Sequence, residues 1–416
     1  MNHTVLFNHS WSKPFLPTGG TEKIYLLIRA HGGEGSKDAK DRAPINLSLV
    51  LDRSGSMSGE PLSYSKKACQ FVTEQMNVND LLSLVAFDDH VRTVFMPVKV
   101  AHKDLIKQRI DSIEAGGTTN LSGGLIEGAQ HVLKNKADGM VNRVILLSDG
   151  HANEGITDHE KLLAIAKEYR SSGVGISALG IGEGFDEELM EGIAEHGGGN
   201  FYYIDKAENI PAIFQEELHG LLSVVAQNVK LKLIPSEGTQ IAGLYGYPAD
   251  NQAGHPVIYT GDFYQDEVKS ILVELAFLPH SQGEHNVLQL HWEYVDVTEN
   301  AAACSITIDV KAVFTSDINL LHVPGNPEVL QKVELTKSAK VIEEAMAAFD
   351  QGDMEHGQKL LKAQADQMLQ MSVTMNSLVM VEESAKLYSH LENFEYSSKK
   401  RKELHQEKYR RMKRKQ

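Results

Sequence analysis

The sequence predicts a mainly α/β protein: a doubly wound, mostly parallel sheet with an antiparallel β-sandwich and a C-terminal helical segment. Three changes of hydrophobic pattern lead to this fold class. Over residues 44–225, strand-length apolar runs alternate with helical patterns, which predicts a parallel sheet with helices on both faces. Over residues 226–315, apolar residues recur at alternate positions, as in antiparallel strands with one buried face. Residues 327–396 return to helical spacing, with a break at 351–353.

Length and composition indicate a globular protein with more than one domain. A chain of 416 residues is too long for one ordinary core, and 42% hydrophobic with 23% charged residues is common among globular proteins. The two cysteines, Cys69 and Cys304, fall in different predicted domains, which suits a reducing compartment rather than a disulfide framework. The first residues lack a signal-peptide pattern, and no apolar run approaches membrane-spanning length. We therefore expect a cytoplasmic protein without a membrane span.

Changes in pattern also divide the chain into segments. An alternating strand at 23–29 can join the later sandwich, in which case the α/β unit is an insertion between two parts of it. The expected segments are an N-terminal extended stretch and strand at 1–43, the α/β unit at 44–225, the sandwich at 226–315, a helical hairpin or small bundle at 327–396, and a basic tail at 397–416.

Local signals predict the individual elements of the α/β unit. Buried strands are expected at 47–51, 81–87, 91–100, 144–148, 176–181 and 200–204. Helices are expected at 62–76, 105–113, 121–133, 187–195 and 207–225. One more helix is expected to open with a capping box at Thr157–Glu160 and to stop at Gly173. Asp88, Asp89 and His90 are interpreted as a hairpin turn rather than as paired catalytic acids.

The first buried strand ends abruptly in Asp52-Arg-Ser54-Gly-Ser56. One carboxylate and two hydroxyls at alternate positions present oxygen atoms at the edge of the sheet. Oxygen donors of this kind suit Mg²⁺, which takes few protein ligands besides water. The alternative is a turn in which Asp and Ser cap the following helix.

Two later stretches favour the metal interpretation. Gly117-Thr-Thr119 precedes a helical pattern, and the strand at 144–148 ends in Asp149-Gly150. Since open α/β sheets gather ligands at the carboxyl ends of their strands, these residues are expected to meet the Asp52 loop at one edge.

These motifs, in this order, resemble the metal-ion-dependent adhesion site (MIDAS) of the von Willebrand factor A (VWA) family. Carried over residue by residue, the predicted metal site consists of Asp52, Ser54, Ser56, Thr119 and Asp149. The family pattern G-x-T-x-(Ile/Leu)-x-x-G-(Leu/Ile) matches at Thr119 rather than at Thr118. The resemblance implies that Ser54, Ser56 and Thr119 ligate directly when a ligand is bound, while Asp52 and Asp149 act directly or through water.

The resemblance implies a binding function rather than an enzymatic one. Two carboxylates roughly neutralise a divalent ion, and an Asp or Glu from a protein partner takes its open position. Mg²⁺ is favoured, and Mn²⁺ or Ca²⁺ is possible with the same donors. The alternative is a Mg²⁺-dependent enzyme or enzyme subunit acting on phosphate-containing substrates, with His151 as the candidate base. Nucleotide-loop, zinc-protease and hydrolase motifs are absent from the sequence.

Charge is distributed unevenly along the chain. The net charge is −15, yet residues 399–416 hold ten Lys or Arg and only two Glu, a local charge of +8. A terminal basic run is expected to be a solvated extension that can contact an acidic surface or nucleic acid. Its removal is therefore expected to leave the metal affinity unchanged.

Overall fold

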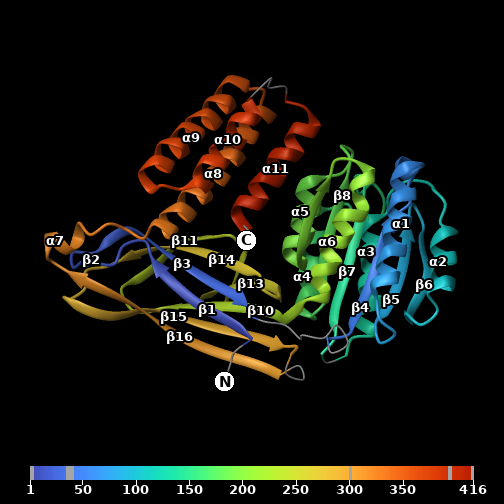
Figure 1. Cartoon of the computed structure of the whole chain (residues 1–416), viewed down its shortest axis with the longest axis horizontal. Helices are drawn as coiled ribbons and strands as arrows, with labels where there is room; N and C mark the ends of the chain where they lie inside the picture. The colour runs from blue at the N-terminus through green and yellow to red at the C-terminus, as the bar shows by residue number, and fades with distance from the viewer. Residues whose placement is uncertain (1–3, 34–41, 138, 299–301, 392–395, 414–416) are drawn as a thin grey trace.

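A parallel sheet, a β-sandwich and a helical bundle make up the computed structural model (Figure 1). It describes residues 4–33, 42–137, 139–298, 302–391 and 396–413. Among the helices of these ranges, none has both the length and the apolar character needed to cross a membrane.

The α/β unit is built on a sheet of order β6-β5-β4-β7-β8-β9, in which only the β5–β6 pair is antiparallel. Its strands are β4 (Ile45–Asp52), β5 (Leu81–Phe87), β6 (Val91–Lys99), β7 (Val141–Ser148), β8 (Gly175–Ile181) and β9 (Gly198–Ile204). Both central strands, β4 and β7, are buried along their whole length because helices cover both faces. The predicted doubly wound fold class is confirmed.

Two hydrophobic cores lie on opposite faces of this sheet. One face is covered by α1 (Glu60–Gln75), α2 (Lys103–Asp111) and α6 (Ile210–Leu222), and the other by α3 (Leu121–Lys134), α4 (His159–Ser171) and α5 (Glu187–Gly197). Alternation along β4 serves both cores, since Leu49 and Leu51 enter the first and Val50 enters the second.

Several helix boundaries differ from the sequence prediction by a few residues, and α4 and α6 show why. The N-cap of α4 is Asp158, whose side chain accepts a hydrogen bond from the Lys161 N–H at 3.0 Å, so the capping box opening at Thr157 is wrong. The helix predicted at 207–225 begins with the 3₁₀ turn η2 (Ala207–Asn209), and its helical part ends at Leu222. The chain then continues as a strand from Val224.

The sandwich consists of two antiparallel sheets, apart from one short parallel pair at an edge, with orders β1-β3-β14-β11 and β12-β13-β10-β15-β16-β2. Its strands are β1 (Val5–Trp11), β2 (Leu16–Pro17), β3 (Thr21–Gly32), β10 (Val224–Pro235), β11 (Thr239–Tyr245), β12 (Ala249–Gln252), β13 (His255–Tyr264), β14 (Val268–Phe277), β15 (Gly283–Asp296) and β16 (Ala302–Thr315). Trp292 lies in the core between the sheets and stacks on Phe7 with ring centroids 4.3 Å apart. Because β3 precedes the α/β unit and β10 follows it, the chain leaves the sandwich and returns to it, crossing between the two units twice.

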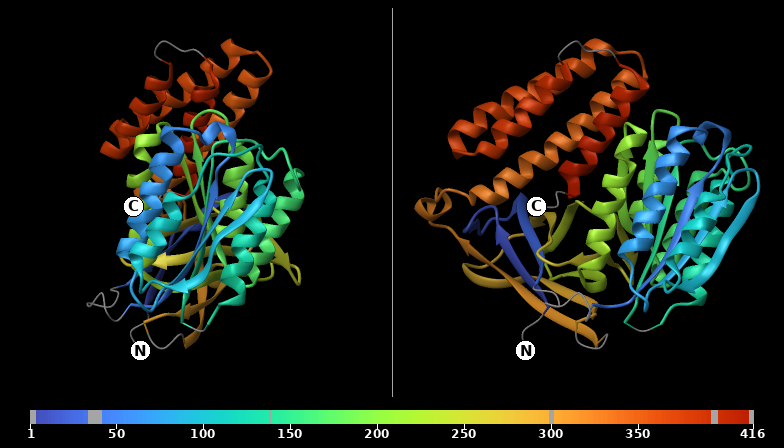
Figure 2. Two further views of the ribbon diagram at one scale, coloured as in Figure 1. Left: turned by 90° about the vertical axis from the view of Figure 1, so that its right-hand side faces the viewer. Right: turned by 45° about the vertical axis from the view of Figure 1, so that its right-hand side comes forward.

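The C-terminal helices form a bundle that reaches both other units (Figure 2). After the short α7 (Ile318–Leu321), the bundle contains α8 (Pro327–Asp350), α9 (Met354–Met375), α10 (Leu378–Leu391) and α11 (Ser398–Lys413). The break predicted at 351–353 separates α8 from α9, where Asp353 caps the second helix. Met368 and Met380 are buried in the bundle core rather than exposed for a partner.

The expectation of a solvated basic tail is wrong for the described residues of that segment. Residues 398–413 form helix α11, which lies between the rest of the bundle and α5 of the α/β unit (Figures 1 and 2). Its cations contact acidic side chains on both sides, and Lys402 and Arg411 are buried. The acidic surface that this segment contacts therefore belongs to the same chain, and residues 414–416 lie outside the described ranges.

Candidate functional site

The candidate site lies where β4 and β7 end at one edge of the sheet. The Asp52 carboxylate turns back into its own loop, where its Oδ1 accepts a hydrogen bond from the Ser54 N–H at 2.8 Å. The neighbouring strand holds the same loop, because the Arg53 N–H donates to the Phe87 carbonyl at 2.8 Å. The 3₁₀ turn η1 (Gly55–Met57) then directs the chain into α1. The Asp52 loop is thus ordered by local bonds.

Hydrogen bonds join this loop to the end of β7. Ser56 Oγ donates to Asp149 Oδ1 at 2.8 Å, and Ser54 Oγ lies 3.2 Å from Ser56 Oγ. Ser148 Oγ donates to Asp52 Oδ2 from the adjacent strand. Four of the five predicted side chains therefore form one connected cluster.

Thr119, the fifth predicted residue, belongs to the loop that precedes α3, and it lies beside Gly150, which follows β7. A Cβ atom on Gly150 would approach Thr119 Oγ1 to 3.1 Å, so a side chain at position 150 would crowd the Thr119 hydroxyl. Asn153 Oδ1 accepts a hydrogen bond from the Thr119 N–H at 2.9 Å, and the Asn153 N–H donates to the Thr119 carbonyl at 3.2 Å. The structure thus brings the three predicted segments to one place.

Sequence reasoning missed two positioning residues, Ser148 and Asn153. Ser148 immediately precedes Asp149 at a strand end, where a buried hydroxyl is itself a signal for a buried acceptor. Asn153 carries no pattern of its own, because its partner is 34 residues away in the chain.

The site has a buried base and an open surface. Asp52 is 0% exposed and Thr119 is 3% exposed, whereas Ser56 is exposed and Asp149 is partly exposed. Burial raises the pKa of Asp52 to about 6, although hydrogen bonds from Ser148 and Ser54 oppose the shift. Burial likewise raises the pKa of Asp149. The two carboxylates and three hydroxyls of these segments are oxygen donors of the kind that a divalent cation binds.

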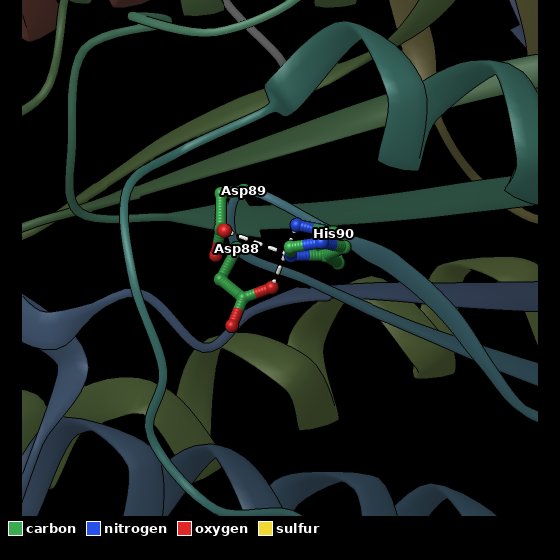
Figure 3. Close-up of side chains that lie close together, drawn as sticks. All are labelled: Asp88, Asp89 and His90. Carbon is green, nitrogen blue, oxygen red and sulfur yellow. Dashed lines mark hydrogen bonds and ion pairs between the residues drawn. The ribbon is translucent and has the colours of Figure 1, made fainter.

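A second group of possible metal-binding side chains, Asp88, Asp89 and His90, forms the turn between β5 and β6 (Figure 3). Asp88 is buried, and protein donors already occupy both of its oxygens. The His90 N–H donates to Oδ1 at 2.9 Å, and Oδ2 accepts from the Gly117 N–H at 3.2 Å and from Arg53 at 2.8 Å. Despite partial burial, these two N–H groups and the Arg53 cation hold the pKa of Asp88 below its ordinary value. The predicted hairpin turn is present, and Asp88 ties the Asp52 and Thr119 loops together.

Replacing Asp88 with Ala is expected to weaken Mg²⁺ binding by roughly 10- to 100-fold, because the two loops lose their shared anchor. Isothermal titration calorimetry on the full chain measures this loss. The matched control is His90→Ala, which removes an exposed member of the same group and should leave the affinity unchanged. A large loss of affinity in the control would instead assign the metal to the turn itself.

The candidate base of the enzymatic alternative points elsewhere. His151 is exposed, and its Nδ1 lies 3.9 Å from Asp186 Oδ2 at the start of α5. The same carboxylate also contacts His159 at 2.9 Å. These contacts provide no oriented general base at the Asp52–Asp149 cluster.

Comparisons with known proteins identify the domain class. Residues 46–216 match the family model of the von Willebrand factor type A domain, and this region is named the VWA domain after that match. Over 202 residues it is 32% identical to the uncharacterized protein YfbK of Escherichia coli (strain K12), covering 47% of this chain and 35% of that protein. The chain thus spans about a third of the length of this relative.

Two solved structures match nearly the whole chain. The von Willebrand factor type A protein from Catenulispora acidiphila aligns with a TM-score of 0.74 and 17% identity, covering 92% of this chain and 89% of that one. The ArnB paralog VWA2 from Sulfolobus acidocaldarius aligns with a TM-score of 0.67 and 17% identity, covering 99% and 98%. At these identities the likeness concerns the fold, which by itself indicates no particular enzyme.

Proposed function

We propose that the VWA domain holds a divalent cation at the predicted metal site and uses it to capture an acidic side chain of a protein partner. The five residues of this site are Asp52, Ser54, Ser56, Thr119 and Asp149. The observation that supports the proposal is that three distant segments meet at one sheet edge. Hydrogen bonds connect Asp52, Ser54, Ser56 and Asp149 there, and Thr119 lies beside Gly150. Ser56 and Asp149 face outward there, above a buried base.

The charge of the donor set supports capture of an anion. Asp52 and Asp149 supply two negative charges, and the three hydroxyls are neutral, so a bound divalent ion retains affinity for a further carboxylate. Mg²⁺ suits so small a set of oxygen ligands, and Mn²⁺ accepts the same donors. When bound, the cation would supply an electrophilic position for the carboxylate of the partner.

The proposal is tested by selecting displayed random peptides on the immobilised full chain in the presence of Mg²⁺ and eluting them with a chelator. Enriched peptides should share an Asp or Glu whose change to Asn or Gln abolishes binding. Peptides without a shared acidic residue would contradict carboxylate capture. Turnover of a phosphate ester that depends on Asp52 and needs no protein partner would support the enzymatic alternative instead.

Replacing Thr119 with Ala is expected to reduce binding of the selected peptide by more than about tenfold and Mg²⁺ affinity by only a few-fold. The resemblance implies direct ligation by this hydroxyl in the ligand-bound state, while Asp52 and Asp149 supply most of the attraction for the free ion. Calorimetric titrations with Mg²⁺ alone and with peptide measure the two effects separately. Thr118→Ala is the matched control, because Thr118 is the exposed neighbour and lies outside the site. Equal losses in both titrations of Thr119→Ala would contradict its role.

A further inference from the structure

The C-terminal helix α11 contacts the loop that connects β8 to α5. Ser398 Oγ donates to the carbonyl of Glu183 at 3.2 Å, and Lys402 Nζ donates to the carbonyl of Phe185 at 2.8 Å. The Lys402 ammonium also pairs with Glu187 Oε2 at 2.5 Å and lies 4.4 Å from the centroid of the Phe185 ring. With its side chain only 3% exposed, Lys402 is a buried cation that is held by this loop and by the first residue of α5.

The same loop packs directly behind the candidate metal site. A Cβ atom placed on Gly184 would come within 2.7 Å of the Asp149 carbonyl oxygen, so the two backbones are in close contact. The loop ends at Asp186, which caps α5 by accepting a hydrogen bond from the Leu189 N–H at 3.0 Å. A displacement of residues 182–185 would therefore change the backbone position of Asp149.

The opposite side of α11 is anchored in the bundle. Leu404 belongs to the bundle core, and Arg411 is buried against α10, where it lies 3.2 Å from the Glu383 carboxylate and donates to the Glu383 carbonyl at 3.0 Å. Toward the VWA domain, Arg401 pairs with Glu188 at 2.8 Å and His405 contacts Glu191 at 2.5 Å, both on α5. Helix α11 thus links the bundle to the loop behind Asp149 through buried contacts.

We infer that α11 acts as a clamp on residues 182–185, with Lys402 as the positioning residue, and thereby sets the metal affinity of the VWA domain. The inference rests on the proposed function, because it concerns regulation of the same site. A clamped loop holds the Asp149 backbone in place before the ion binds, so the ion does not have to order it. By linkage, an ion that binds the clamped state more tightly must also stabilise the docking of α11.

The test compares full-length Lys402→Met with Lys400→Met. Lys400 lies on the same helix and pairs with Glu403 of that helix at 3.6 Å. In Mg²⁺ titrations we expect Lys402→Met to bind about 3- to 10-fold more weakly than wild type, whereas Lys400→Met should bind normally. Amide hydrogen exchange should show faster exchange at 149–153 and 182–186 in Lys402→Met only, which general destabilisation would not confine to these segments.

A second measurement needs no variant. Adding Mg²⁺ to the wild-type chain should slow amide exchange throughout α11, far in sequence from every proposed ligand. Unchanged exchange in α11, together with normal Mg²⁺ affinity of Lys402→Met, would overturn the clamp while leaving the proposed function intact. A wild-type chain that binds no Mg²⁺ would instead refute the proposed function itself.

Discussion

Replacement of Asp52 with Asn should abolish Mg²⁺ binding, with a loss of more than about 100-fold, without lowering the stability of the metal-free protein. The carboxylate is fully buried beside Asp149, so its charge is costly when no cation is bound. An Asn in the same place can accept the bond from the Ser54 N–H, and its NH₂ group can donate to the Ser148 hydroxyl after that hydroxyl rotates. Calorimetry with Mg²⁺ and chemical unfolding in a chelator measure the two quantities.

Asp80→Asn provides the matched control for this prediction. Asp80 is equally buried but lies near the opposite end of the sheet, where it bonds the Ile45 N–H at 2.8 Å and Arg42 Nη1 at 2.9 Å. Because the control breaks a paired buried charge, its free energy of unfolding should fall by on the order of 3 kcal/mol while the Mg²⁺ affinity stays normal. If Asp52→Asn unfolded more easily than wild type in chelator, the carboxylate would stabilise the metal-free fold, which would contradict its assignment as a metal ligand.

Arg411→Met should lower the local stability of the bundle by about 3 kcal/mol. The guanidinium is 1% exposed and donates to the carbonyl of Glu383 at 3.0 Å and to Glu407 Oε1 at 2.7 Å. Methionine fills much of the volume but leaves the buried Glu383 and the half-buried Glu407 carboxylates with fewer cationic partners. Hydrogen exchange of peptides from α8 to α11 reports the local opening free energy, whether or not the other units unfold with the bundle.

The same network predicts a pH dependence of bundle stability. Burial raises the pKa of Glu407, but hydrogen bonds and charge from Arg410 and Arg411 bring this pKa from its ordinary 4.5 down to about 2. A depressed carboxyl pKa contributes stability that is fully present above pH 4.5 and is lost as the pH falls toward 2. Because Arg411→Met removes one of the cations that depress this pKa, the variant should lose the stability at a higher pH than the wild-type chain does. Lys386→Ala is the control, because this half-exposed lysine pairs with Glu383 three residues away, and its replacement should cost less than about 1 kcal/mol.

Much of the fold follows from local patterns in the chain. The strands of the VWA domain are continuous apolar runs because both faces of the parallel sheet are buried, and this pattern is visible without coordinates. The candidate site is predictable for a related reason. Asp52 and Asp149 directly follow such runs, so the topology of a parallel sheet places them at one edge. Helix ends were less predictable, as at Asp158, because neighbouring Thr and Asp residues are both good caps.

Local sequence patterns are enough to predict the α/β class, the alternating strands of the sandwich, and the meeting of the Asp52, Thr119 and Asp149 segments at one sheet edge. The positioning residues Ser148, Asn153 and Asp88 and the place of α11 depend on contacts between segments far apart in the chain, which the folded structure alone reveals. The basic segment at 399–416 is predicted to be solvated when each cation is considered only with its neighbours in the sequence. The partners that bury Lys402 lie more than 200 residues earlier in the chain, and no local pattern pairs cations and carboxylates across that separation.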